Sequence, residues 1–195
     1  LDGRDGRGGL RWADARGAPM SRLSIAIISR EYPPFFGGGI GTYTEEFSRS
    51  LAGAGHRVVV VTVSGDGVEQ RETRDGVEVV RLPFIDGDDW SGPHPAIADE
   101  EAVAAFGQFS PVSVLAMQVA RALPGLVDEY GIDTVEAPDT GALSWFALNA
   151  RRLGRPCGAR GWPVFTTHLH SPTAWIERLD RAPATGRGMI ELKRM

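Results

Sequence analysis

The chain has 195 residues, of which 42% are hydrophobic and 24% are charged, and these proportions are sufficient for one folded domain with an apolar core. A formal net charge of −4 argues against non-specific nucleic-acid binding, which requires a basic surface. The single cysteine, Cys157, excludes an internal disulfide and is expected to be a structural or surface thiol.

Residues 1–20 alternate arginine, aspartate and glycine and lack the apolar core of a signal peptide. Because such a segment cannot bury a core, we predict a disordered leader or tag, with Met20 as a candidate for the native start. Residues 21–195 are predicted to form one domain. No apolar run approaches the roughly 18 residues of a membrane span, so the expected location is cytoplasmic.

A strand, a glycine-rich loop and a helix are predicted first. Residues 23–29 are apolar and β-branched, as in a strand buried on both faces. After the glycines, residues 42–52 have the spacing of a helix, and 56–63 form a second buried strand. The predicted apolar face of the helix consists of Ile40, Tyr43, Phe47 and Leu51. This β-α-β order is typical of a doubly wound fold.

The remaining segments extend the same pattern. Arg74-Asp75-Gly76 separates two alternating runs, 68–72 and 77–82, and Asp-Gly in this context predicts a β-hairpin. Residues 85–97 lack periodicity and are predicted to be a loop. The later predictions are a helix over 111–130 that Pro124 kinks or splits, a strand over 132–135, a helix over 141–153, a buried strand over 163–167 and a helix over 172–179. The predicted fold class is α/β: a Rossmann-like, doubly wound, mostly parallel sheet with a β-hairpin insertion.

The glycines Gly38, Gly39 and Gly41 lie between the first strand and the first helix. Glycines allow the backbone to approach a ligand closely, and a helix amino terminus attracts anions, so this order predicts a phosphate site. The segment is not a P-loop, because no Gly-Lys-Ser/Thr follows. It also departs from the dinucleotide fingerprint, because Thr44 occupies the position of the third glycine. A simple surface turn is the alternative.

Polar residues follow two later strands. Glu136 and Asp139 come after the strand near 135, and His168 and His170 come after the strand near 167. Because ligands of open parallel sheets bind at the carboxyl ends of the strands, we expect these side chains and the glycines to surround one crevice. The histidines are candidates for contacting a ligand oxygen or phosphate, and ordinary loop residues are the alternative. No metal site is predicted, because a third ligand with clear spacing is missing.

The sequence resembles the N-terminal domain of retaining glycosyltransferases of the GT-B fold, the group 1 or GT4 type, over about residues 21–179. The matching segments are Pro34-Phe-Phe-Gly-Gly-Gly-Ile-Gly-Thr-Tyr, Leu51-Ala-Gly-Ala-Gly-His-Arg-Val-Val-Val-Val-Thr, Val135-Glu-Ala-Pro-Asp and Phe165-Thr-Thr-His-Leu-His-Ser-Pro. The resemblance implies an acceptor-side Rossmann-like domain facing a second domain that binds most of a nucleoside-diphosphate sugar.

The resemblance also implies roles for the candidate residues. Gly38, Gly39 and Gly41 would meet the donor diphosphate, and His168 would act as the catalytic histidine that contacts the donor sugar. The acceptor or sugar contacts would be Glu136, Asp139 and His170, of which His170 has no assured counterpart in the family. The donor-binding domain with its Glu-x7-Glu signature is expected to be missing from residues 1–195, so this segment alone is expected to be inactive.

No cofactor is expected apart from the nucleoside-diphosphate sugar as donor substrate. The expected partners are that nucleotide sugar, a carbohydrate or lipid-linked acceptor and the chain's own C-terminal domain, with a peripheral membrane contact as a further option and no nucleic acid. Two other functions stay open. In an NAD(P)-dependent Rossmann oxidoreductase, Asp66 would meet a ribose hydroxyl, and a non-catalytic nucleotide- or glycan-binding module would need no second domain.

Overall fold

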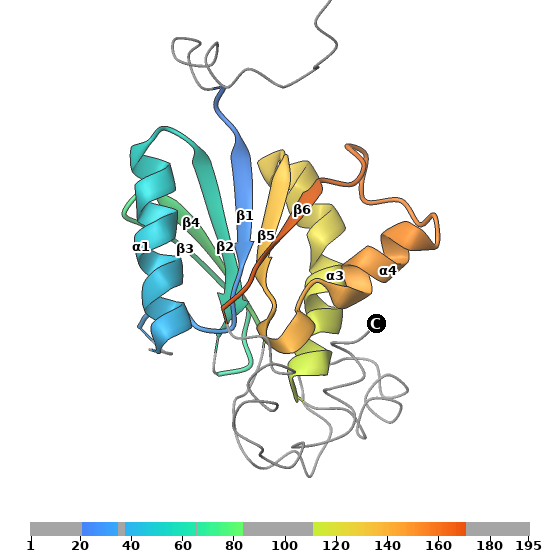
Figure 1. Cartoon of the computed structure of the whole chain (residues 1–195), viewed down its shortest axis with the longest axis horizontal. Coiled ribbons are helices and arrows are strands. Elements are labelled where there is room, and N and C mark those ends of the chain that lie inside the picture. Colours follow the sequence, from blue (N-terminus) through green and yellow to red (C-terminus); the bar gives the residue numbers. More distant parts are fainter. Residues whose placement is uncertain (1–20, 35–37, 65, 84–110, 171–195) are drawn as a thin grey trace, which may run out of the picture.

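A computed structural model describes residues 21–34, 38–64, 66–83 and 111–170, and these form one α/β unit (Figure 1). The sheet has the strand order β3-β4-β2-β1-β5-β6. The elements are β1 (Ser24–Ile28), α1 (Gly39–Gly53), β2 (Arg57–Val63), β3 (Gln70–Arg74), β4 (Val77–Leu82), α3 (Pro111–Tyr130), β5 (Thr134–Pro138), the 3₁₀ turn η2 (Thr140–Ala142), α4 (Trp145–Arg152) and β6 (Val164–His168). The predicted Rossmann-like fold class is confirmed.

Two apolar layers cover the sheet, one on each face. Helix α1 lies against one face, and α3 and α4 lie against the other (Figure 1). The layer under α1 consists of Ile25, Ile27, Tyr32, Val58, Val60, Val77 and Val79. The opposite layer is larger and joins alternate residues of the same strands to buried residues of α3, among them Leu115, Leu123 and Val127. Runs that are apolar at every position therefore form strands buried on both faces, as predicted.

Helix α1 begins at Gly39, three residues before the predicted start. Its fully buried positions are small: Gly41, Thr44 and Ser48. Phe47 and Leu51 are only partly buried and pack against the apolar layer beside this line. The predicted apolar stripe is therefore correct for Phe47 and Leu51. The positions of α1 that lie nearest to the sheet are instead the small residues, which allow the helix backbone to lie close to it.

The Asp-Gly hairpin is confirmed. Asp75 and Gly76 have φ values of 52° and 78°, and β3 pairs antiparallel with β4 across this turn. The positive φ values match the right-handed twist of the two strands. Strand β3 spans Gln70–Arg74 rather than the predicted 68–72. The pairs β4–β2, β2–β1, β1–β5 and β5–β6 are parallel.

Boundaries in the last third of the domain differ from the predictions. Strand β5 spans Thr134–Pro138, so Glu136 lies inside a strand and not after it. Gly141 has a φ of 77°, which is incompatible with a helix, and the predicted helix over 141–153 therefore begins at Trp145. Helix α3 is confirmed and contains Pro124 without being divided there.

Strand β6 was predicted to be buried, and this prediction is wrong. It lies at one end of the strand order, and four of its five residues are exposed. The burial rule for parallel strands applies to strands with neighbours on both sides and helices on both faces. His168 is the last residue of β6 and is therefore part of the strand end itself.

The predictions for residues 1–20, for the loop 85–97 and for the helix over 172–179 lie outside the described residues. Within the described part of the chain, no helix is both long enough and apolar enough to cross a membrane.

Candidate functional site

The order in which strands are added to the sheet reverses at β1, because β2 and β4 lie on one side of it and β5 and β6 on the other. In doubly wound sheets the crevice at such a point, beyond the carboxyl ends of the strands, is the usual ligand site. A cavity of about 240 Å³ lies at this position. Its lining consists of Arg30, Glu31, Ile40, Val112, Pro138, Thr140, Gly141 and Leu143.

The three predicted phosphate-binding glycines lie at the amino terminus of α1. Gly38 precedes the helix, while Gly39 and Gly41 belong to its first turn rather than to a loop. The backbone N–H of Gly41 donates to Glu31 Oε2 over 3.2 Å. A Cβ atom added to Gly38 would collide with this carboxylate oxygen. A carboxylate of the chain itself therefore occupies the position at which an anion was predicted.

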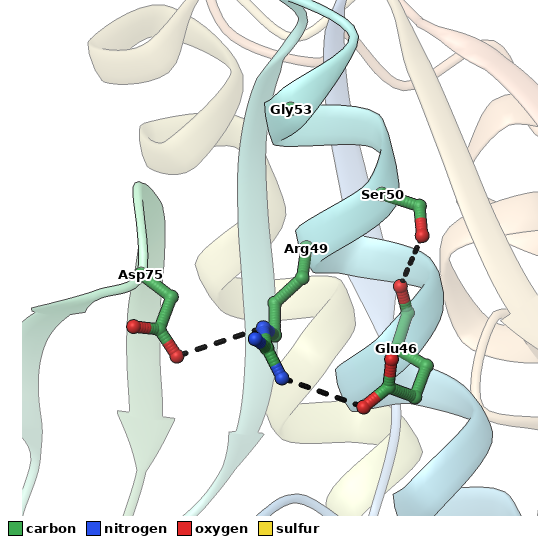
Figure 2. Close-up of a pocket in the computed structure, with 5 residues that line it drawn as sticks. All are labelled: Glu46, Arg49, Ser50, Gly53 and Asp75. Atoms are coloured by element: carbon green, nitrogen blue, oxygen red, sulfur yellow. Dashed lines mark hydrogen bonds and ion pairs between the residues drawn. The ribbon is translucent and has the colours of Figure 1, made fainter.

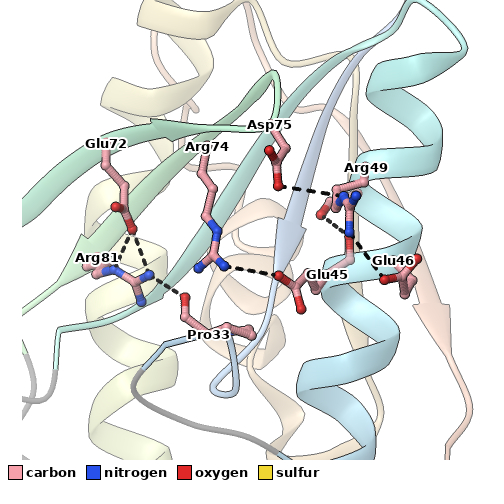
Figure 3. A network of polar contacts seen from close by, with 9 residues as sticks. Pro33, Glu45, Glu46, Arg49, Glu72, Arg74, Asp75 and Arg81 are labelled. Atoms are coloured by element: carbon pink, nitrogen blue, oxygen red, sulfur yellow. Dashed lines mark hydrogen bonds and ion pairs between the residues drawn. The ribbon is translucent and has the colours of Figure 1, made fainter.

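The segment that carries Glu31 is tied to the sheet at both ends. The hydroxyl of Ser29 donates to the carbonyl oxygen of Glu31 over 2.9 Å. Farther along, the buried guanidinium of Arg81 donates to the carbonyl oxygen of Pro33 over 2.7 Å and to Glu72 Oε1 over 2.8 Å (Figure 3). These bonds hold residues 29–33 in one position in front of α1.

Tyr43, Glu136 and His168 form a cluster beside the glycines. The Tyr43 hydroxyl donates to Glu136 Oε1 over 3.1 Å and lies 2.8 Å from His168 Nδ1. The distance between His168 Nδ1 and Glu136 Oε1 is 3.6 Å. A helix, an inner strand and an outer strand each supply one member, so these three side chains meet only in the folded protein.

Asp139 and His170 extend this cluster. The imidazole rings of His168 and His170 stack with centroids 4.5 Å apart, and His170 also contacts the Tyr43 ring edge-on at 4.9 Å. Asp139 Oδ1 accepts the backbone N–H of His170 over 3.0 Å. The structure thus brings together the four polar residues predicted to follow β5 and β6, and Asp139 acts there by holding the backbone of His170.

Sequence reasoning missed the role of Tyr43. Helical spacing places it on the apolar stripe with Phe47 and Leu51, and its ring does stack on Phe47 with centroids 5.3 Å apart. Its hydroxyl, however, reaches beyond β1 to β5 and β6. A signal was available: Tyr43 lies in the first helical turn after the glycines, and a side chain in this turn points back toward the strand ends.

Burial and the Glu136 carboxylate raise the pKa of Tyr43 from 10.0 to about 12. Between these pH values the folded protein retains a proton that the unfolded chain has released, so the stability contributed by this proton is complete below pH 10.0 and is lost as the pH rises toward 12. We expect the difference in unfolding free energy between wild type and Tyr43→Phe to shrink over this interval. Denaturant titrations at a series of pH values measure it, and a constant difference would contradict the expectation.

A second, shallow hollow lies over the solvent side of α1 and the hairpin turn. Arg49 is placed there between Glu46, 3.4 Å from its Nη1, and Asp75, 3.7 Å from its Nε (Figure 2). These side chains are exposed, and exposed ion pairs of this kind contribute little free energy. We therefore assign no chemistry to this hollow.

The residues of the alternative functions were also located. Asp66, the candidate for a ribose contact, accepts the backbone N–H of Val68 over 3.0 Å and a side-chain N–H of Gln70 over 2.7 Å. The bond from Val68 lowers the pKa of Asp66. Together the two bonds stabilise the turn before β3, and this is the structural role of the Asp66 carboxylate. Among the described residues, no group of three or more His, Cys, Asp and Glu side chains is arranged to hold a metal ion.

Comparisons with known proteins identify the family of this sequence. A family model described as "Glycosyl transferase 4-like domain" matches residues 38–191. The chain is also similar to glycogen synthases of two strains of Mycobacterium tuberculosis, CDC 1551 / Oshkosh and ATCC 25618 / H37Rv. Each alignment is 36% identical over 64 residues and covers 30% of this chain and 16% of the relative. The matched region is thus a small part of these longer proteins.

Proposed function

Because the chain belongs to the family of glycosyl transferase 4-like domains, we propose that it forms the acceptor-side domain of a glycosyltransferase. The enzyme would transfer a hexosyl group from a nucleoside-diphosphate sugar to a carbohydrate or lipid-linked acceptor. The observation that carries this proposal is that Tyr43, in the first turn of α1, contacts Glu136 and His168 at the carboxyl edge of the sheet.

Each part of this edge has a role in the proposed reaction. Negative charge develops on the leaving diphosphate as the glycosidic bond breaks, and backbone N–H groups already directed at it would stabilise that charge. The first turn of α1 would supply such groups at Gly39 and, once the Glu31 carboxylate is displaced, at Gly41. Beside them, His168 is proposed to contact the donor sugar, and Glu136 and His170 to face the acceptor.

We further propose that a second domain completes the donor site. The described edge offers one helix terminus and one polar cluster, which contact only one side of a ligand. Family relatives are longer than the matched region, and the alignment covers 16% of the two glycogen synthases. We therefore expect residues 1–195 to bind a nucleoside diphosphate weakly and to catalyse little transfer without that domain.

Ligand titrations of the chain test the proposal directly. We would add uridine, guanosine and adenosine diphosphates, and separately NADH, to ¹⁵N-labelled protein at concentrations up to millimolar. One diphosphate is expected to shift the amide resonances of Gly39, Gly41 and His168. Saturable binding of NADH without a response to any of the diphosphates would overturn the proposal in favour of an oxidoreductase.

Substitution of Gly39 by valine separates ligand approach from folding. An added Cβ at Gly39 has no atom within 4 Å, so the fold accepts the side chain, which would stand where a phosphate must approach the backbone. We expect the affinity for the diphosphate to fall about tenfold, equivalent to about 1.4 kcal/mol. Stability should change by less than about 1 kcal/mol, the range of helix propensities.

The matched control is Gly53→Val. Gly53 is the last residue of α1, and a Cβ added there also has no atom within 4 Å. It lies at the opposite end of the same helix, so diphosphate binding should be unchanged. Equal affinities of the two variants would remove the amino terminus of α1 from the site.

A further inference from the structure

The cluster of Tyr43, Glu136 and His168 contains more hydrogen-bonding atoms than protons to share between them. Tyr43 Oη contacts both Glu136 Oε1, at 3.1 Å, and His168 Nδ1, at 2.8 Å. A phenol has one proton, and an ionised carboxylate only accepts. A neutral imidazole carries its proton on one of its two nitrogens, and the other nitrogen accepts. The geometry therefore restricts where each proton can be.

Two arrangements must be compared. If the Tyr43 hydroxyl donates to Glu136, its oxygen lone pairs face His168, and Nδ1 must carry a proton to complete the 2.8 Å contact. If the hydroxyl instead donates to Nδ1, the phenol oxygen and the carboxylate oxygen face each other at 3.1 Å with no proton between them. The second arrangement places two acceptors in contact, and the partial negative charges of the two oxygens repel each other.

The surroundings favour the first arrangement. Glu136 Oε1 also lies 3.6 Å from His168 Nδ1, so a proton on that nitrogen is attracted to the carboxylate as well. Ring contacts restrict rotation of the partners: Tyr43 stacks on Phe47 at 5.3 Å, and His168 stacks on His170 at 4.5 Å. The raised pKa of Tyr43 keeps its hydroxyl protonated, and thus a donor, throughout the neutral range.

We infer that Tyr43, oriented by Glu136, is a positioning residue that holds the His168 proton on Nδ1 and leaves Nε2 as a hydrogen-bond acceptor. The Nε2 atom then accepts a bond from an O–H donor, such as a sugar hydroxyl, and repels an oxygen of a diester phosphate, such as the diphosphate of a nucleotide sugar, which has no proton to give at neutral pH. This extension to a sugar hydroxyl rests on the proposed function, whereas the protonation of His168 is a property of the protein without ligand.

The protonation of His168 is measurable in the isolated chain by ¹⁵N NMR of the imidazole nitrogens. Two-bond ¹H–¹⁵N spectra distinguish the Nδ1–H from the Nε2–H form, and a pH series identifies the neutral imidazole. The His168 signals are assigned from their loss in His168→Gln. We expect a single Nδ1–H form in the wild type. In Tyr43→Phe, which retains the ring but removes the hydroxyl, we expect a mixture of both forms.

The same spectrum contains an internal control, a histidine that carries its proton on the other ring nitrogen. His56 Nδ1 accepts the backbone N–H of Leu23 over 3.2 Å, so the His56 proton lies on Nε2. The His56 signals should show that form in both proteins. Tyr130→Phe, a second loss of a phenol hydroxyl, should leave His168 as in the wild type because Tyr130 contacts Arg71 and lies outside the cluster.

Two results would overturn the inference: an Nε2–H form of His168 in the wild type, or the same His168 spectrum in wild type and Tyr43→Phe. Neither result depends on a ligand, so failure of this inference is distinct from failure of the proposed glycosyltransferase function. Conversely, the expected spectra would stand even if no nucleoside diphosphate bound to the chain.

Discussion

Replacing Arg81 by alanine is expected to lower the free energy of unfolding by about 3 kcal/mol, the range for loss of a large buried side chain together with its hydrogen bonds. Only 1% of the Arg81 side chain is exposed, and its guanidinium bonds Pro33 and Glu72. The Glu72 side chain is 45% exposed and can be hydrated after the substitution, so its charge is not buried without a partner. Chemical denaturation of both proteins measures the loss.

The matched control is Arg49→Ala. Arg49 also pairs with a carboxylate of this hairpin, Asp75 in its turn, but it does so from helix α1 and 48% of its side chain is exposed (Figure 3). Exposed pairs contribute about 0–1 kcal/mol, so the control should remain close to the wild type. Hydrogen exchange adds a local readout: the amides of residues 29–32 should exchange faster in Arg81→Ala. Equal stabilities of the two variants would show that the buried guanidinium does not fix this segment.

Replacing His168 by alanine is expected to reduce kcat/KM of the full-length protein by about 100-fold, the lower range for losing one group that interacts with a transition state. The assay uses the donor identified by the nucleotide titrations. Stability should change by less than about 1 kcal/mol, because 43% of the His168 side chain is exposed at the end of an outer strand and truncation leaves no closed cavity.

Val164→Ala is the control for this substitution. Val164 lies at the amino end of β6, four residues from His168 on the same face of the strand, and is 64% exposed. Its truncation should leave kcat/KM unchanged. If His168→Ala lost stability and activity in the same proportion, the histidine would be a structural residue, and the site would have to be centred elsewhere.

Local patterns were sufficient to predict most of the fold. Residues 25–28 of β1 and 58–61 of β2 are apolar at every position, which indicated inner strands. Asp75-Gly76 determined the hairpin because few residue pairs adopt two positive φ values. Strand ends were less certain. Glu136 and His168 were expected after their strands and belong to them, because nothing in a short apolar run marks where sheet pairing stops.

Contacts over long sequence distances could not be predicted in this way. Tyr43 is 93 residues from Glu136 and 125 from His168, and its helical spacing indicated only a packing role. Arginine is a residue type that is rarely fully buried, yet Arg81 is buried and bonds Pro33 and Glu72. In both cases the decisive property is the position of a partner on another element, which residue type and periodicity do not contain.

The carboxylate of Glu31 at the amino terminus of α1 has a consequence for the energetics of ligand binding. An empty helix terminus of this kind would be hydrated, and an anion would displace water alone. Here the Gly41 N–H already bonds a carboxylate, so an anion at that N–H must replace Glu31 rather than add to it. The measured binding free energy is then the difference between the interaction of the ligand with this N–H and that of the Glu31 carboxylate. It therefore depends on the chain's own carboxylate as much as on the ligand.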